Sequence, residues 1–453
     1  MTPGALDPRI TFTRASIGTY FDVAGVLQTS RVNTLLWSTD FNNAVWGLFQ
    51  GATKSAAIIG PDGSLSGITL TFAAQASSQI LQTISPPAGS TFSCYMRANT
   101  LSSAVLRFSA DGSSPTLTLT SSWQRFQFTG VGGANANVAI NTVGSAAGSI
   151  DIAMPQLELG TPASVYAPTT TAANGAPRWD YDPVTHALRG LLIEEQRINV
   201  LLNSATLGTQ SVAVTAQAYT LSFYGTGTVT LSGVSTAGPL VGTGAFPTRV
   251  ALTFTPTAGT LTLTVTGSVL NAQLEAGAFA TSVIPTTAAA VTRSADVASM
   301  PTAAWFSAAQ SSLVAEYMVP QSPNPSATLN RDVCVLSDNS VNNRLILRGQ
   351  GFSNSNPQIG TSITGTTTFS ASLGSVAANV AAKVGGSWNG VAAVGSSNGG
   401  AVVSNALGIP AGLNLLTFGN DFSGASLYIN GWMRRVQYWP RALSNSELQQ
   451  VTT

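Results

Sequence analysis

The stretch that decides the fold runs from Arg178 to Leu202 and reads RWDYDPVTHALRGLLIEEQRINVLL. It holds four of the chain's 18 acidic residues and its single histidine. The pattern predicts a short strand over Arg178–Tyr181, a turn at Asp182-Pro183, because proline restricts its own backbone and that of the residue before it, and a return strand over Leu188–Leu192. The run Gly190–Ile193 is too apolar to be left in water. We therefore expect a packed β-hairpin that joins two larger β units, rather than an exposed charged linker.

The composition indicates a folded chain with few surface charges. With 453 residues, the chain should divide into roughly three domains. Charged residues make up 8% of it, against about a quarter in average soluble domains. Since 44% of the residues are hydrophobic and the net charge is +1, the chain lacks the signature of disorder. Its surface must consist largely of hydroxyls and amides, which lowers solubility. Burial of this surface in an oligomer or a large assembly would relieve that.

Several functional classes are disfavoured by charge and hydropathy. The near-zero net charge supplies no electrostatic footprint for nucleic acid. No apolar run reaches the length of about 18 residues that a membrane helix needs, so we expect no membrane insertion. The N-terminal sequence MTPGALDPRITFTRAS has no positive leader and no apolar core, which predicts synthesis in the cytoplasm without a signal peptide. Cys94 and Cys334 lie far apart, so no disulfide framework is expected.

An internal repeat defines two copies of one domain. The opening phrase Arg31-Val-Asn-Thr-Leu-Leu-Trp-Ser38 matches Arg197-Ile-Asn-Val-Leu-Leu-Asn-Ser204. The closing phrase Gln156-Leu-Glu-Leu-Gly160 matches Gln273-Leu-Glu-Ala-Gly277, and in both cases a proline follows ten residues after the glutamate. Matching openings and closings predict two copies of the same fold, with Glu158 and Glu275 at equivalent places in the last strand. The second copy is the shorter.

The pattern inside both copies is β throughout. Gln124–Thr129, Thr228–Ser232 and Thr260–Thr266 alternate with a period of two, which places one set of side chains in a core and the other outside. We therefore predict an all-β protein of tandem jelly-roll or β-sandwich domains with a short helix near the C-terminus. The expected segments are an N-terminal β-hairpin or attachment segment (1–30), a first jelly-roll domain (31–173), a connecting hairpin (174–196), a second, shorter jelly-roll domain (197–297) and a third domain (298–453).

The third domain changes character and ends in a helix. Strands are expected at 312–319, 344–348, 387–394, 414–419, 425–431 and 432–439. Ser444, with Glu447 three residues later, forms a capping box that predicts the start of the helix.

Two sets of phrases resemble known families. The order Leu427-Tyr-Ile-Asn-Gly431, Arg435-Val-Gln-Tyr-Trp439 and Pro440-Arg-Ala-Leu-Ser444 resembles the closing strands of concanavalin A-like (laminin-G-type) jelly rolls. The phrases at 10–29, 178–202 and 156–169 resemble recurrent segments of tailed-bacteriophage virion proteins of the fibre, spike or minor tail type, whose repeated domains are similar to carbohydrate-binding jelly rolls. The resemblance implies a virion component with a glycan-facing fold. In one departure from that pattern, the first β domain looks inserted between segments expected to be adjacent.

The sequence offers no catalytic residues. His186 is the only candidate base for a nucleophilic triad, and it falls in the predicted turn without a nucleophile nearby. The best-spaced carboxylate pair, Glu194-Glu195, would point to opposite faces of a strand, so it cannot flank one glycosidic bond. The shortage of His and Cys also argues against a zinc site. We expect no enzyme and no protein-bound metal of that kind.

Binding is the remaining class. Asn420 and Asp421, with Trp388 and Trp432, form the candidate ligand-binding set of the third domain, because aromatic faces and polar side chains together hold sugars. No cofactor is expected, and Ca²⁺ is the one ion that carboxylate and carbonyl oxygens of this domain would suit.

The leading hypothesis is a phage virion structural protein that displays glycan-binding jelly rolls for attachment to the host. Its partners would be other virion proteins, a host cell-surface glycan and further copies of itself, most naturally in a trimer. The alternatives are an architectural or decoration subunit that binds no sugar and a polysaccharide depolymerase.

Overall fold

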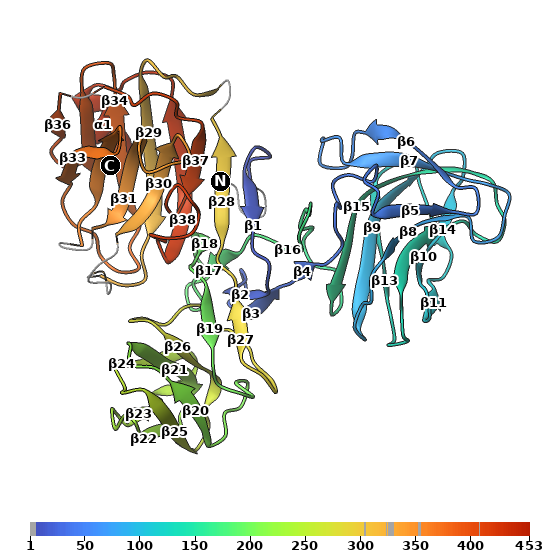
Figure 1. Cartoon of the computed structure of the whole chain (residues 1–453), viewed down its shortest axis with the longest axis horizontal. Coiled ribbons are helices and arrows are strands. Elements are labelled where there is room, and N and C mark those ends of the chain that lie inside the picture. The colour runs from blue at the N-terminus through green and yellow to red at the C-terminus, as the bar shows by residue number, and fades with distance from the viewer. Residues whose placement is uncertain (1–5, 303–304, 323, 325–329, 352–354, 407) are drawn as a thin grey trace. The chain divides into compact units, whose positions relative to one another are not determined.

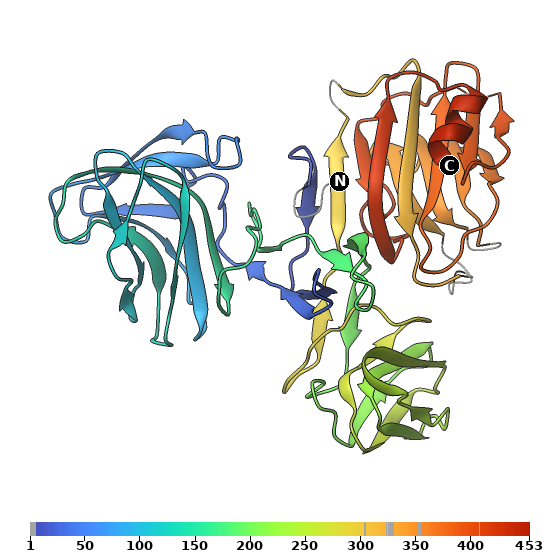
Figure 2. The same ribbon diagram turned by 180° about the vertical axis from the view of Figure 1, so that it is seen from behind.

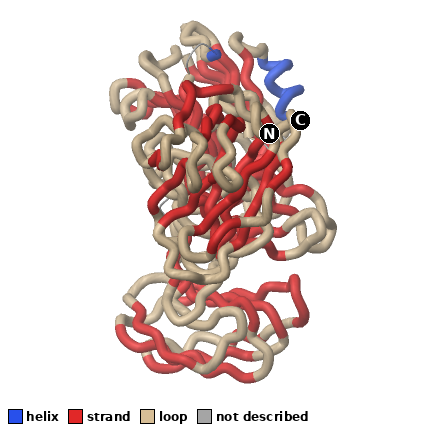
Figure 3. The backbone as a smooth tube through the Cα atoms, turned by 90° about the vertical axis from the view of Figure 1, so that its right-hand side faces the viewer, coloured by secondary structure: helices blue, strands red, loops and turns tan. Residues whose placement is uncertain are grey.

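The computed structural model describes residues 6–302, 305–322, 324, 330–351, 355–406 and 408–453. Regular structure is nearly all β, which confirms the predicted fold class (Figure 3). The chain divides into two compact units (Figure 1). Unit 1 consists of Met1–Arg14, Gly18–Thr29 and Pro177–Thr453, and unit 2 of Ala15–Ile17 and Ser30–Ala176. Unit 2 is therefore inserted into the chain of unit 1.

The larger part of unit 1 is a sandwich of two seven-stranded sheets, which we call the C-terminal sandwich. Its core is lined by apolar side chains from both sheets, among them Phe12, Leu191, Tyr317 and Trp388. The first sheet has the order β1 (Thr11–Thr13), β28 (Val297–Pro301), β37 (Leu415–Phe418), β30 (Arg331–Ser337), β31 (Arg344–Gln350), β32 (Gln358–Ile363), β33 (Thr366–Ser372). The second has the order β17 (Trp179–Tyr181), β18 (Leu188–Ile193), β38 (Gly431–Trp439), β29 (Ser311–Met318), β34 (Ala382–Trp388), β35 (Ala393–Ser397), β36 (Val403–Asn405).

The stretch at 178–202 forms the expected hairpin, because β17 and β18 pair across a turn in which Asp182 accepts the backbone N–H groups of Val184 and Thr185. The hairpin is packed, as expected: Leu191, Leu192 and Ile193 are all buried. Its role differs from the one predicted. Since β18 pairs with β38, the hairpin is an edge of the C-terminal sandwich and not a link between two other domains.

The N-terminal segment also belongs to the C-terminal sandwich. Strand β1 pairs with β28, and Phe12 is part of the core. The division into 1–30, 174–196 and 298–453 as separate segments is therefore corrected, because strands from all three make up one sandwich. Sequence order could not reveal this, because strands far apart in the chain can pair even though consecutive strands do so more often.

Two strand predictions in the third domain are wrong. The segment 387–394 contains the turn between β34 and β35, in which the Asn389 side chain accepts the N–H groups of Val391 and Ala392. The segment 425–431 is irregular up to β38, and within it Leu427 and Asn430 adopt positive φ values of 54° and 45°, outside the β region.

The predicted C-terminal helix is present as α1 (Asn445–Thr452) (Figure 2). Its capping box is complete. The Ser444 hydroxyl accepts the Glu447 N–H, and the Glu447 carboxylate accepts the Ser444 N–H at 2.8 Å. Leu448 is fully buried and packs with Val314 of β29, so the helix covers part of the outer face of the second sheet.

Unit 2 is a sandwich with its own core, built around side chains such as Phe92, Phe108 and Ile152. One sheet has the order β11 (Gly112–Ser113), β10 (Ser103–Phe108), β14 (Asn137–Asn141), β8 (Gln79–Thr83), β5 (Trp46–Phe49), with β12 (Leu117–Thr118) also paired to β10. The other has the order β13 (Gln124–Thr129), β9 (Ser90–Ala98), β15 (Gly148–Leu159), β7 (Gly67–Phe72), β6 (Thr53–Ile58). Cys94 here and Cys334 in unit 1 are buried free thiols.

The second copy lies in unit 1 as a smaller sandwich with its own core. Its sheets have the orders β24 (Gly244–Phe254), β21 (Tyr219–Gly225), β26 (Leu270–Ala276) and β20 (Gln210–Val214), β25 (Gly259–Thr266), β22 (Thr228–Gly233), β23 (Leu240–Val241). Short two-stranded pairs complete the described structure: β2 (Gly18–Phe21) with β3 (Leu27–Ser30), β4 (Val32–Asn33) with β16 (Asn174–Gly175), β19 (Arg197–Asn199) with β27 (Val291–Arg293).

The two copies have the same strand order, as the repeat predicts. The sheet segment β13-β9-β15 corresponds to β24-β21-β26, and β10-β14-β8 corresponds to β22-β25-β20, with the strands met in the same sequence along the chain. The second copy has no counterparts of β5, β6 and β7 among its described residues, which accounts for its shorter length.

A buried polar network is also repeated position by position. Glu158 accepts the N–H and the hydroxyl of Ser164, and Glu275 accepts the same groups of Thr281, at 2.7 Å for both. Asn199 spans two carbonyls and two N–H groups, and Asn33 does so at the matching place in the first copy. Buried polar groups need such partners. The Gln-Leu-Glu phrase thus recurs in both copies because its glutamate makes the same buried hydrogen bonds in each.

Candidate binding pocket

Five charged side chains from distant parts of the chain form a buried cluster in unit 1. They are Arg14, Arg178, Glu194, Arg293 and Asp296, none more than 6% exposed. Nη1 of Arg14 lies 3.0 Å from Asp296. Oε2 of Glu194 lies 2.9 Å from Arg178 and 2.6 Å from Arg293, and Arg178 also pairs with Asp296. The cluster ties the N-terminal segment, the hairpin and the segment after the second copy together.

Glu194 sits at the edge of this cluster and faces the second copy. Its Oε1 accepts the Ser282 N–H at 2.7 Å, and its Oε2 accepts the Ser282 hydroxyl at 2.6 Å. Burial by itself would raise the pKa of Glu194, but the charges of Arg293 and Arg178 outweigh it and lower the pKa to about 2. Glu194 is therefore a permanent anion that fixes the Ser282 loop against the hairpin.

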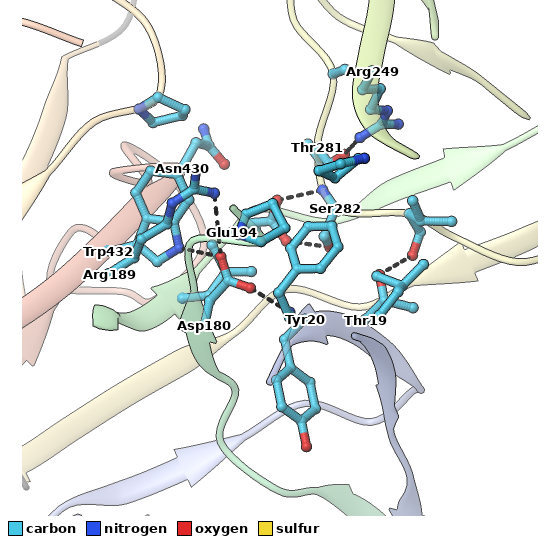
Figure 4. A pocket seen from close by; sticks show the side chains of 18 of the residues that line it. Thr19, Tyr20, Asp180, Arg189, Glu194, Arg249, Thr281, Ser282, Asn430 and Trp432 are labelled. Carbon is cyan, nitrogen blue, oxygen red and sulfur yellow. Dashed lines mark hydrogen bonds and ion pairs between the residues drawn. The ribbon is translucent and has the colours of Figure 1, made fainter. Parts of the chain in front are cut away.

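Beside Glu194 lies a pocket of about 240 Å³ (Figure 4). It is bounded by the β2–β3 hairpin, by β18 and β38 of the C-terminal sandwich, and by loops of the second copy. Both aromatic rings and hydrogen-bonding side chains line it. The aromatic members are Tyr20, Phe21, Tyr224, Phe279 and Trp432, and the polar ones include Asp180, Arg189, Arg249, Ser282 and Asn430.

Asp180 fixes one wall of the pocket. Its Oδ1 accepts the Phe21 N–H at 2.6 Å, and its Oδ2 accepts the Trp432 indole N–H at 2.8 Å. The nearest cation is Arg189, whose Nη1 lies 3.9 Å away. Burial raises the pKa of Asp180 to about 6 in spite of these donors. Its carboxyl group therefore changes charge close to neutral pH.

Stacked rings and guanidinium groups form the other surfaces. The Arg189 guanidinium lies 4.9 Å from the Trp432 ring centroid and donates to Asp182 at 2.8 Å. On the second copy, Arg249 lies 5.8 Å from the Tyr224 ring centroid and donates to the Thr281 carbonyl at 2.5 Å. No described carboxylate lies within ion-pair distance of Arg249.

The protein itself donates hydrogen bonds to both carboxyl groups of the pocket. A glycosidase needs one carboxyl group to protonate the leaving oxygen and a second to attack or to activate water. In this pocket, both oxygens of Asp180 and both oxygens of Glu194 already accept hydrogen bonds from the protein. The pocket is also lined by aromatic rings, which can contact the C–H groups of a sugar. Its amide and guanidinium groups can bind hydroxyls.

Of the four ligand-binding residues predicted from the sequence, Trp432 alone lines this pocket. Trp388 is 1% exposed and belongs to the core of the C-terminal sandwich. Asn420 is fully buried, and Asp421 accepts the hydroxyls of Ser423 and Ser426 within its own loop. The structure therefore does not bring the four together. In the described part of the chain, no group of three or more His, Cys, Asp or Glu side chains is arranged to hold a metal ion.

The pocket residues that the sequence did not reveal come from segments far apart in the chain. Asp180 and Arg189 lie in the opening stretch, but Phe21, Tyr224 and Arg249 carry no motif. The repeat alone could have pointed to two of them, because Arg249 and Tyr224 of the second copy correspond to Arg125 and Tyr95 of the first. His186 lies in the hairpin turn with a φ of 60° and is exposed, so it takes no part in the pocket.

No protein-family model and no curated protein matches the chain. Among the described residues, no helix combines the length and the apolar character needed to cross a bilayer.

Proposed function

We propose that the chain is a structural subunit of a bacteriophage particle, of the fibre, spike or tail type, and that its pocket holds a saccharide of the host surface. The phage part of the proposal rests on the resemblance of segments 10–29, 156–169 and 178–202 to virion proteins. It is supported by the β-sandwich architecture and by the few surface charges.

One observation carries the saccharide part of the proposal: Trp432, whose indole N–H donates to Asp180, lines one pocket together with Tyr224 and Arg249. Aromatic rings and hydrogen-bonding groups that line one pocket are the kinds of group that contact the apolar and polar parts of a sugar ring. The volume of about 240 Å³ suits one or two sugar residues better than a large cofactor.

We also infer that the chain works as a homo-oligomer, with a trimer as the arrangement typical of fibres. A surface with so few charges favours association. Apolar side chains such as Phe49 (53% exposed) and Val131 (88% exposed) add to it.

A glycan array of purified bacterial surface polysaccharides tests the proposal. The full chain should bind at least one of them, and the variants Phe21→Ala and Arg189→Gln should lower the affinity about tenfold or more, because each removes one wall of the pocket. Arg441→Gln is the matched control, since Arg441 forms an exposed pair with Glu447 of α1, outside the pocket lining. Equal binding by all variants would contradict the pocket assignment. No binding by the wild-type chain would favour a purely architectural subunit, and release of reducing ends would favour a depolymerase.

A further inference from the structure

The two copies carry the same arginine-tyrosine pair on the outer face of equivalent sheets. In the second copy Arg249 donates to Ser222 at 2.7 Å and lies over Tyr224. In the first copy Arg125 donates to Ser93 at 3.0 Å and lies 5.7 Å from the Tyr95 ring centroid. Each arginine also donates at 2.5 Å to the carbonyl six residues after the glutamate of its copy.

The equivalence extends to the next position on the same face. Pro247, two residues before Arg249, lines the pocket of unit 1, and Trp123 stands two residues before Arg125. The side chains of Phe92, Cys94 and Met96 face the core of unit 2. Alternation along β9 therefore places Tyr95 and Arg97 on the opposite face, which is the outer one.

A row of side chains crosses this outer face from strand to strand. Arg97 on β9 stands opposite Asp151 on β15, and Asp151 stands opposite Thr69 on β7. On its other side, the Arg97 guanidinium lies 4.6 Å from the ring centroid of Trp123, the residue before β13. The row has no counterpart in the second copy, where Thr226 follows Tyr224 at the equivalent spacing.

Asp151 holds Arg97 in a fixed position. Its Oδ2 accepts the Arg97 Nε–H at 2.8 Å, and its Oδ1 accepts the Thr69 hydroxyl at 2.7 Å and the Asn99 amide at 3.4 Å. Asp151 is buried, whereas the Arg97 side chain is 34% exposed. The two Nη groups of Arg97 have no hydrogen-bond partner among the described residues. A flat guanidinium with two free donors is matched to a carboxylate.

An exposed ion pair with a stacked ring also occurs on protein surfaces that bind nothing, where it adds little stability. Two features separate this surface from that case. First, the buried carboxylate of Asp151 fixes the orientation of Arg97. Second, the neighbouring pair Tyr95 and Arg125 repeats the pair Tyr224 and Arg249 that lines the pocket of unit 1.

We propose that this face of unit 2 is a second saccharide-binding surface, specific for sugars that carry a carboxylate. The Nη groups of Arg97 bind the carboxylate, and the rings of Trp123 and Tyr95 support the apolar faces of the sugar and its neighbour. The surface belongs to unit 2 and the pocket around Asp180 belongs to unit 1, and we expect each to bind without the other.

The test uses the full chain on an array of purified bacterial capsular polysaccharides, both uronate-containing and neutral. We expect the wild-type chain to bind uronate-containing members, and Trp123→Ala and Arg97→Gln to lower that affinity about tenfold or more. Phe49→Ala, an exposed aromatic on β5 of the opposite sheet of unit 2, should leave it unchanged. Thermal unfolding checks that each variant is folded.

The pocket variant Phe21→Ala keeps the two proposals distinguishable. Loss of uronate binding in Trp123→Ala with retention in Phe21→Ala supports the second surface. Unchanged uronate binding in both Trp123→Ala and Arg97→Gln overturns it, whatever happens at the pocket. Binding of neutral polysaccharides alone also overturns it, because the arginine would then have no carboxylate to hold.

Discussion

Arg14 and Asp296 are 282 positions apart, yet Nη1 of Arg14 lies 3.0 Å from Oδ1 of Asp296, and both side chains are fully buried. Between them in the chain lie the whole of the inserted unit 2 and the second copy. The pair therefore lies beside β1 and β28, two neighbouring strands of one sheet that the chain separates by two insertions. Three arginines share two carboxylates in the cluster around it, so the loss of either carboxylate leaves buried positive charge without compensation.

Asp296→Asn should destabilise unit 1 by about 3–5 kcal/mol, because Arg14 and Arg178 lose their shared anion in a buried site. Denaturant unfolding measures the change. Asp7→Asn is the matched control, since Asp7 forms an exposed pair with Arg9 that contributes little. Similar midpoints for the two variants would show that the cluster does not hold the sandwich together.

The stability of unit 1 should depend on the charge of Asp180. Its folded pKa of about 6 lies above the ordinary value of 3.8, so the folded state binds the proton more tightly than the unfolded state. Stability is therefore lost as the pH rises from about 4 to about 6, by roughly 2–3 kcal/mol at about 1.4 kcal/mol for each pKa difference of one.

Asp180→Asn removes this dependence, so its stability relative to the wild-type chain should rise by that amount between pH 4 and pH 7. Denaturant midpoints across this range provide the measurement. The control Asp182→Asn should show no such rise, because hydrogen bonds from the Thr185 and Val184 N–H groups lower the pKa of Asp182 to about 2. A constant difference between wild type and Asp180→Asn would mean that the carboxyl is already ionised at pH 4.

Leu192→Asp should cost several kcal/mol, because it places a charge between Met318 and Trp432 in an apolar cluster. Thermal unfolding followed by limited proteolysis reports the loss and shows whether cleavage begins at the hairpin. Leu65→Asp, at a leucine that is 67% exposed, is the control and should change little. Unchanged melting of Leu192→Asp would indicate that the hairpin contributes no packing.

Unit 2 should be removable. Val32 pairs with Gly175, so the two ends of the insert lie side by side, and a few glycines can join Thr29 to Pro177. We expect the shortened chain to be monodisperse and to retain the β-type circular dichroism and the unfolding transition of unit 1. Aggregation of the shortened chain would contradict the view that unit 1 has a complete core of its own.

Light scattering coupled to gel filtration tests self-association. We expect a mass three times that of the chain. A single-chain mass across a wide concentration range would count against the proposed trimer.

The sequence predicted the parts of the fold that depend on neighbouring residues. The Asp182-Pro183 turn and the apolar run after it were enough for the hairpin, and the phrases at Asn33 and Asn199 were enough for the repeat, because the same buried network requires the same residues in both copies. The strand expected at 387–394 failed because its apolar pattern continues through the turn at Asn389.

The pocket could not be predicted in the same way. Trp388 and Trp432 stand in similar β contexts, and only the pairing of β38 with β18 decides that Trp432 faces away from the core, beside Leu192. Phe21 and Arg249 reach the pocket from other segments. Sequence spacing contains no information about contacts made by such distant strands and loops.

The central claim is that the pocket around Asp180 and Trp432 holds a saccharide, and a crystal structure of the full chain with a glycan selected on the array tests it most directly. The account predicts electron density for a sugar ring against the Trp432 and Phe21 rings, with hydroxyls within hydrogen-bond distance of Arg189 or Asn430. A bound glycan with no density in this pocket would contradict the claim.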